Sequence, residues 1–435
     1  MKLAIRGDLL DFTAAPAWGG TAMQGVRWRP DHWLLVDEGR IAGALPAAQA
    51  PGDDWQRVDH RGRLVMPGFI DTHVHCPQLD VIASYGAGLL DWLETYTFPA
   101  ERRFADPAVA HAGAALFLDA LLAHGSTTAV VFPTVHKVSA EALFEAAAAR
   151  GMRIVAGKVL MDRHAPDGLR DEVEGAERDC EDLIRRFHGR GRNAYAVTVR
   201  FAATSTREQL AMAGRLLQRH EGVYMQTHVA ENTDEVKWIA ELFPEARSYL
   251  DVYARHGLLN ERAVLAHGIW LDAQDRQRLA DTGAQIAFCP TSNLFLGSGL
   301  FDWQAAVDSG HRVSLASDVG GGTSLSMTRT LAEAYKVQML RGTRLSAWTA
   351  LHTATRGAAE ALGLAHEIGH FDEGATADLV VWDWAATPVA AHRDAVARGA
   401  VPPLPAQDLH ARVFAWMTLA DERCRVATYV AGRAT

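Results

Sequence analysis

Residues 64–75 read Leu-Val-Met-Pro-Gly-Phe-Ile-Asp-Thr-His-Val-His, an apolar run that ends in alternating polar residues. The apolar part predicts a buried strand over 64–71, because short apolar runs next to turn residues are typical of core strands. Side chains alternate along a strand, so His73 and His75 point to the same side and one metal ion can bind both. An H-x-H pair is weak evidence alone, because the chain has 19 histidines.

The same kind of apolar strand recurs after this stretch, separated each time by Ala- and Leu-rich helical patterns. The predicted strands lie at 64–71, 127–132, 153–160, 195–201, 223–228, 263–267, 285–289 and 312–316. Eight strand-and-helix repeats with nearly continuous apolar strands predict an α/β fold, a (β/α)8 TIM-type barrel around a buried parallel sheet. An open doubly wound sheet has the same periodicity and is the structural alternative.

The two ends of the chain have a different pattern, with short β-like runs broken by Gly and Pro. We expect residues 1–63 and 375–435 to form one small discontinuous β-sandwich domain, and residues 64–374 to form the metal-dependent barrel. A hairpin turn is predicted at 37–41. Residues 386–408, with four prolines, are predicted to be an irregular loop.

Composition narrows the class of protein. The chain has 435 residues, a net charge of -9 and 49% apolar residues, which is ordinary for a globular enzyme. A nucleic-acid partner is disfavoured, because such a surface needs clustered Lys and Arg. The four cysteines lack C-x-x-C spacing, so neither a disulfide framework nor a cysteine zinc site is expected. No run has the pattern of a signal peptide or a membrane span, so we expect a cytoplasmic protein with no membrane partner.

Polar residues stand where several predicted strands end. His228 ends the fifth strand, His267 ends the sixth, and Asp318 follows the eighth. In a barrel these positions meet at the C-terminal mouth, together with His73 and His75. Histidines plus one carboxylate, with room for water, suit a catalytic Zn²⁺, although the same ligands accept Fe²⁺.

Two further residues bear on the metal chemistry. Glu231 lies three residues after His228, close enough to shuttle protons to and from a water on the metal. Its alternative role is that of an acid in the first turn of a helix. Lys158 lies on the third strand, while the fourth ends in Arg200-Phe201. In related sites with two metal ions, a lysine of the barrel bridges the ions, and no lysine stands at the end of the fourth strand here. We therefore expect one metal ion rather than two. Lys158 is expected to have a structural or hydrogen-bonding role.

Several segments resemble a known family. Residues 67–75 are similar to the first-strand signature of the amidohydrolase superfamily. Within that superfamily, further segments resemble the guanine deaminases, and the resemblance covers about residues 67–374. These segments are Pro77-Gln78, Asp91-Trp92-Leu93, Tyr96-Thr97-Phe98-Pro99-Ala100-Glu101, Arg200-Phe201, Cys289-Pro290-Thr291-Ser292-Asn293-Leu294 and Ser317-Asp318-Val319-Gly320-Gly321-Gly322.

The resemblance implies a fold, a reaction and a role for each matching residue. It implies that a homodimeric enzyme hydrolyses guanine to xanthine and ammonia with one zinc ion per subunit. The zinc ligands would be His73, His75, His228 and Asp318, with His267 contacting the metal or its water. Glu231 would move protons, and Asp318 and His267 would orient the water. Gln78 and Arg200 would hydrogen-bond the purine edge, with Phe201 against the ring and Trp92 also in the substrate site.

The sequence departs from the family at Val199, where a proline is common, and at Ala202-Ala203. Both changes flank Arg200, which is expected to hydrogen-bond the ring. The sequence therefore leaves the identity of the ring open. The alternatives are 8-oxoguanine, a pterin or an aminotriazine. Deaminases of the cytidine type need P-C-x-x-C, which the chain lacks. A barrel scaffold without its metal is disfavoured, because every expected metal ligand is present.

Overall fold

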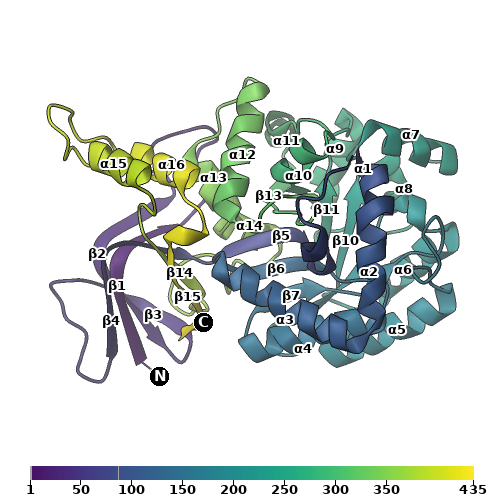
Figure 1. The fold of residues 1–435 in the computed structure, drawn as a ribbon, viewed down its shortest axis with the longest axis horizontal. Helices are drawn as coiled ribbons and strands as arrows, with labels where there is room; N and C mark the ends of the chain where they lie inside the picture. The colour runs from purple at the N-terminus through teal and green to yellow at the C-terminus, as the bar shows by residue number, and fades with distance from the viewer. Residues whose placement is uncertain (1, 87) are drawn as a thin grey trace. The chain divides into compact units, whose positions relative to one another are not determined.

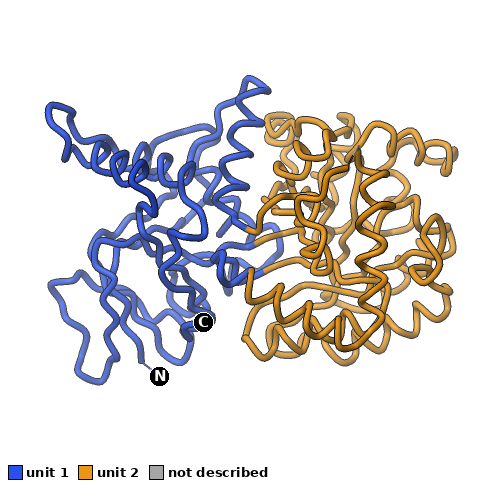
Figure 2. The backbone as a smooth tube through the Cα atoms, in the orientation of Figure 1, with its two compact units in different colours: residues 1–70, 121–128, 326–435 blue, residues 71–120, 129–325 orange. Residues whose placement is uncertain are grey.

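The computed structural model describes residues 2–86 and 88–435. By their contacts, these residues form two compact units, drawn in two colours in Figure 2. One unit contains residues 71–120 and 129–325, and the other contains residues 1–70, 121–128 and 326–435. Every residue predicted for the functional site belongs to the first of these units.

The larger sheet is a nearly closed barrel of strands in sequential order, with helices outside it (Figure 1). Asp318 N donates to His73 O over 3.0 Å and His75 N donates to Val319 O over 2.8 Å, which joins the segment after the last strand to the first strand. The predicted barrel is therefore confirmed, and the doubly wound alternative is wrong. Its strands are β5 (Phe69–His75), β6 (Ser126–Phe132), β7 (Arg153–Ala156), β9 (Asn193–Val199), β10 (Tyr224–Val229), β11 (Ala263–His267), β12 (Gln285–Phe288) and β13 (Arg312–Leu315), with β8 (Val159–Leu160) paired to β9.

The helices that follow the strands have one face towards the sheet. In α6 (Arg207–Arg219), for example, Leu210, Ala213 and Leu217 are buried at helical spacing. The others are α3 (Pro107–Ala123), α4 (Lys137–Arg150), α5 (Val173–Phe187), α7 (Thr233–Leu242), α8 (Tyr249–Arg255), α9 (Ala273–Thr282), α10 (Pro290–Phe295) and α11 (Trp303–Ser309). Short helices follow β5: η1 (Cys76–Val81), α1 (Leu89–Trp92), η2 (Leu93–Thr97), α2 (Phe98–Arg102) and η3 (Arg103–Ala105).

The predicted first strand, 64–71, is wrong in its bounds, because this stretch belongs to two sheets. Strand β4 (Gln56–Pro67) lies in the smaller sheet and β5 begins the barrel. Gly68 N donates to Asp378 O, whereas Phe69 N donates to Gly125 O. A side chain at Gly68 would place its Cβ 2.5 Å from Thr127 Cγ2, so glycine is required here. The chain passes from the smaller sheet to the barrel at Gly68, and the apolar run of the sequence continues across this residue.

The smaller sheet joins the two ends of the chain, as expected. Its strand order is β16-β15-β14-β4-β1-β2-β3, and β4 pairs antiparallel with β14. The hairpin predicted at 37–41 is confirmed, because Asp37 pairs with Arg40. The domain boundaries themselves stay a prediction. The remaining strands are β1 (Lys2–Phe12), β2 (Val26–Asp37), β3 (Arg40–Pro46), β14 (Leu379–Trp382), β15 (Arg425–Val430) and β16 (Arg433–Ala434).

The predicted loop over 386–408 is wrong in part, because α15 (Pro388–Ala397) lies within it. The Thr387 side chain accepts a hydrogen bond from Ala390 N, and Pro388 takes the first helical position, where no backbone donor is needed. The other helices after residue 325 are α12 (Met327–Leu340), α13 (Ala347–Thr353), α14 (Arg356–Ala361), α16 (Leu409–Leu419) and the short η5 (Glu422–Cys424). Among the described residues no single helix could cross a membrane, and one sharply bent helix pair, 89–105 with 107–123, passes on length and composition alone.

Candidate active site

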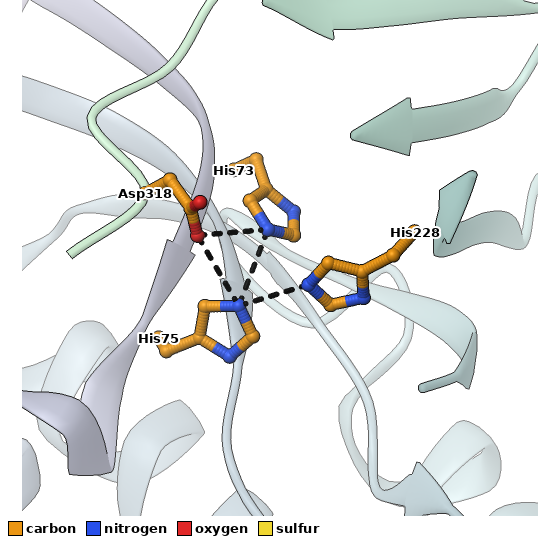
Figure 3. A group of neighbouring side chains, drawn as sticks. All are labelled: His73, His75, His228 and Asp318. Atoms are coloured by element: carbon orange, nitrogen blue, oxygen red, sulfur yellow. Dashed lines mark hydrogen bonds and ion pairs between the residues drawn. The ribbon is translucent and has the colours of Figure 1, made fainter. Parts of the chain in front are cut away.

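Four side chains converge at the C-terminal mouth of the barrel: His73, His75, His228 and Asp318 (Figure 3). His75 Nε2 lies 3.2 Å from His73 Nε2 and 3.2 Å from His228 Nε2. Asp318 Oδ1 lies 3.2 Å from His73 Nε2 and 3.4 Å from His75 Nε2. Two strands, β5 and β10, and the loop after β13 therefore aim four potential ligand atoms at one point.

This arrangement fits a bound metal cation. Burial lowers the pKa of His75 to about 3, so its imidazole is neutral at pH 7 and offers at most one hydrogen to its three neighbours. Ligand atoms about 2.05 Å from a tetrahedral ion lie roughly 3.3 Å apart, which matches the observed 3.2–3.4 Å separations. Nitrogen ligands with one carboxylate suit zinc or iron.

His228 is held in the orientation that a ligand needs. Its Nδ1 donates to the backbone carbonyl oxygen of Arg200 over 2.6 Å, since a carbonyl only accepts. The lone pair of Nε2 is therefore free to face the other three side chains. Hydrogen bonds of this kind fix the tautomer of ligating histidines in metal sites.

His267 lies beside this group rather than inside it. Its Nδ1 is 2.9 Å from Asn293 Oδ1, which accepts the ring proton. Its Nε2 faces two carboxylates, 3.4 Å from Glu231 Oε2 and 3.7 Å from Asp318 Oδ2. His267 thus stands between the four convergent side chains and Glu231.

Glu231 is a buried acid with few polar contacts. Ser298 Oγ donates to its Oε1 over 2.8 Å. Burial, and then the charge of Asp318, raise the pKa of Glu231 to about 8. Glu231 precedes Asn232, the N-cap of α7, so it is not an acid of that helix's first turn.

The backbone is strained at the same end of the barrel. Ala230, His267 and Asp318 have φ values of 48°, 72° and 48°. Left-handed conformations cost residues with a Cβ about 1–3 kcal/mol each and persist where surrounding structure enforces them. All three stand where strands pass into loops, and this is typical of functional sites.

A pocket opens over these groups and includes all four side chains expected to bind substrate. Gln78, Trp92, Arg200 and Phe201 line it together with His75, His228, Glu231, His267 and Asp318. Trp92 is buried, and its Nε1 has no hydrogen-bond partner among the described residues. Val199 ends β9, and Arg200 still reaches the pocket.

Lys158 is not among the residues that line this pocket. Its ammonium group is buried and lies 2.5 Å from Asp171 Oδ1, with which it forms an ion pair. This is the hydrogen-bonding role expected for it.

Four residues that hold the site together were not assigned a role from the sequence: Ser298, Asn293, Glu101 and Glu235. Glu235 accepts from Glu231 N over 2.9 Å and from Tyr249 Oη over 2.7 Å. Glu101 and Asn293 fall within segments that resemble the family, so that resemblance was an available signal. No sequence signal indicates a role for Ser298. It lies 67 positions after its partner Glu231, and this spacing belongs to no recognised motif.

Comparison with known proteins agrees with this geometry. A sequence profile of the amidohydrolase family matches residues 64–435. Guanine deaminase of Escherichia coli (strain K12) is 43% identical over 433 residues, covering 99% of this chain and 97% of the relative. The solved structure of E. coli guanine deaminase has a TM-score of 0.93 at 42% identity, covering 100% of this chain and 99% of that chain.

A second solved structure was obtained with a ligand. Guanine deaminase from C. acetobutylicum, with guanine bound in its active site, has a TM-score of 0.86 at 25% identity and covers 100% of each chain. The chain therefore belongs to the amidohydrolase family. Its full-length relatives place it within the guanine deaminases of that family, so the predicted class of enzyme is confirmed.

Proposed function

We propose that this protein hydrolyses guanine to xanthine and ammonia, using one zinc ion held by His73, His75, His228 and Asp318. The observation that carries the proposal is the convergence of four ligand atoms within 4.8 Å of one another, beside the buried carboxyl group of Glu231. The identity to guanine deaminases along nearly the whole chain supports guanine as the ring.

The metal's contribution is activation of the nucleophile. When bound, zinc lowers the pKa of water from 15.7 to about 7, which supplies a nucleophile near neutral pH. The overall change is the addition of water to C2 of guanine and the loss of its 2-amino group as ammonia, which leaves the 2-oxo ring of xanthine.

Glu231 moves the protons that this change requires. It takes one proton from the attacking water and donates it to the ring nitrogen beside C2 as the new C–O bond forms. It then takes the remaining proton of the attacking water and delivers it to the departing amine. Ser298 holds the Glu231 carboxyl in place during both transfers.

Two further groups orient the attacking water. His267 Nε2 and Asp318 Oδ2 lie 3.7 Å apart, and both face the space beside Glu231. Because Asn293 accepts the Nδ1 proton, His267 presents a lone pair at Nε2 and accepts from the water. The position of the water is thereby fixed relative to C2.

The walls of the pocket bind the ring. The Arg200 guanidinium offers only donors and suits the carbonyl oxygen at position 6, while Gln78 both donates and accepts. Phe201 and Trp92 supply flat apolar surface for the purine faces. We also expect a cytoplasmic homodimer that acts in purine breakdown, with Fe²⁺ as the alternative metal.

The decisive experiment is an ammonia-release assay on a panel of rings. The zinc-loaded protein is incubated separately with guanine, 8-oxoguanine, a pterin and an aminotriazine, and the product from guanine is identified by its absorbance spectrum. We expect the highest kcat/KM for guanine, with xanthine as the product. Turnover of another ring without turnover of guanine would contradict the assignment of the substrate.

A further inference from the structure

Glu101 is a buried carboxylate that holds both polar side chains expected to bind the ring. It lies on α2 and has no exposed surface. Its Oε1 accepts from Gln78 Nε2 over 3.1 Å and its Oε2 accepts from Arg200 Nη1 over 2.6 Å. Neither of these hydrogen bonds joins it to the metal-ligand group or to Glu231, so its effect on the reaction passes through Gln78 and Arg200.

The contacts of Gln78 leave its amide only one orientation. Gly320 N donates to Gln78 Oε1 over 3.1 Å, and Gln78 Nε2 donates to Glu101. A backbone N–H cannot accept and a carboxylate cannot donate, so turning the amide by 180° would break both bonds. One N–H and one oxygen lone pair of Gln78 are left, in a fixed order, for a ligand in the pocket that Gln78 lines.

Gly320 and Phe98 add one contact each to this arrangement, Gly320 to Gln78 and Phe98 to Arg200. A Cβ at position 320 would stand 2.6 Å from Gln78 O and 2.9 Å from Gln78 Cβ, so only glycine brings its N–H this close. The Arg200 guanidinium carbon lies 5.3 Å from the centre of the Phe98 ring, a cation–π contact. Since Phe98 and Glu101 share α2, one short helix makes two contacts with the Arg200 guanidinium.

A fixed amide distinguishes two kinds of purine edge. A 6-oxo ring such as guanine presents an acceptor at position 6 and a donor at N1, whereas a 6-amino ring presents a donor and then an acceptor. An amide that turns freely pairs with either order, and a fixed one pairs with only one. A buried polar group left unpaired is costly, so a site built to pair with one order strongly rejects a ring that presents the other.

We propose that Glu101 is a positioning residue that makes the site selective for 6-oxo over 6-amino rings, by fixing the amide of Gln78 and the guanidinium of Arg200. This inference rests on the proposed function, because it requires deamination at C2. It adds a specificity determinant that neither contacts the ring nor carries a proton in the reaction.

The test compares Glu101→Gln with the unchanged protein on two substrates that share the 2-amino group. Guanine has an oxo group at position 6 and 2,6-diaminopurine has an amino group there. Ammonia release gives kcat/KM for both, and chromatography shows that the C2 bond was hydrolysed. The exposed Glu145→Gln is the matched control. In the variant, the amide at position 101 has one acceptor oxygen and one NH₂ donor, so it can accept from Gln78 or from Arg200 but not from both.

We expect the unchanged protein to prefer guanine at least 100-fold, and Glu101→Gln to lower that ratio at least tenfold, mainly through a higher KM for guanine. An equal loss on both substrates, with the ratio unchanged, would mean that Glu101 only supports the fold and would overturn the inference. If the unchanged protein fails to deaminate guanine, the proposed function itself is refuted.

If Glu101→Gln does not fold, as judged by circular dichroism, Glu101→Asp is measured in its place. Aspartate keeps the charge but is one methylene shorter, so it cannot reach both Gln78 and Arg200 as Glu101 does. Its ratio is expected to lie between those of the unchanged protein and Glu101→Gln. A ratio equal to that of the unchanged protein would contradict the proposal.

Discussion

His228 donates a 2.6 Å hydrogen bond from Nδ1 to the backbone carbonyl oxygen of Arg200, which links a proposed metal ligand to a proposed substrate-binding residue. The link uses the backbone of Arg200, whereas the ring would be bound by its side chain. Changes to that side chain should therefore affect substrate binding without loss of the metal.

We predict that Arg200→Lys keeps a full complement of zinc and raises KM for guanine about 10- to 100-fold, the range for one lost hydrogen bond to a charged group. Lysine still neutralises Glu101 but lacks the planar fork of donors. Metal analysis and steady-state kinetics measure the two effects, with the exposed Arg185→Lys as control. Loss of zinc from Arg200→Lys would contradict the separation of the two roles.

The proton-transfer role of Glu231 is tested by Glu231→Gln. The amide keeps the shape and the contact with Ser298 but cannot exchange a proton, so kcat should fall about 10²- to 10⁴-fold while zinc is retained. The matched control is Glu241→Gln, at an exposed position on α7. Near-normal turnover in Glu231→Gln would remove Glu231 from the mechanism.

Removal of the metal should abolish activity and lower the unfolding temperature, because an ion that binds only the folded state stabilises it. Dialysis against a chelator, followed by added zinc, should remove and then restore both activity and unfolding temperature. His73→Ala should lose the ion, whereas His366→Ala, whose side chain is 70% exposed, should keep it. Full activity in protein shown to contain no metal would refute the proposed chemistry.

Glu235 should make stability depend on pH. Burial raises the pKa of Glu235 to about 7, compared with about 4.3 in an unfolded chain. Between these values the folded state keeps a proton that the unfolded state has released. The contribution of Glu235 to stability therefore falls as pH rises from about 4 to about 7.

The variant Glu235→Gln lacks this titration and still accepts from Glu231 N and Asn232 N. Relative to the unchanged protein, its unfolding temperature should rise steadily between pH 5 and pH 7 and level off above that. Both proteins are measured with zinc bound, so the pH dependence of metal binding is common to them. A difference that stays constant over this range would contradict the raised pKa.

Much of the site could be predicted from the sequence, because a parallel barrel turns strand ends into neighbours. His73, His228 and Asp318 are far apart in the chain, yet each stands at the end of an apolar strand. The fold alone then places their side chains at one mouth. Periodicity therefore carried information about the site as well as about the secondary structure.

Other features leave no local trace in the sequence. The change of sheet at Gly68 occurs within an unbroken apolar run, since both sheets require buried residues there. Ser298 and Glu101 take their positions from partners 67 and 99 residues away, so only the folded chain shows which polar groups they satisfy. The helix α15 is different, because Thr387-Pro388 is a recognisable helix start that the cluster of prolines obscured.

The most direct test of the proposed function is guanine turnover by the zinc-loaded protein in water enriched with ¹⁸O. We predict one ammonia and one xanthine for each guanine consumed, with a single ¹⁸O in the xanthine, as detected by mass spectrometry. Absence of ammonia and xanthine, or xanthine without the label, would contradict hydrolytic deamination of guanine at this site.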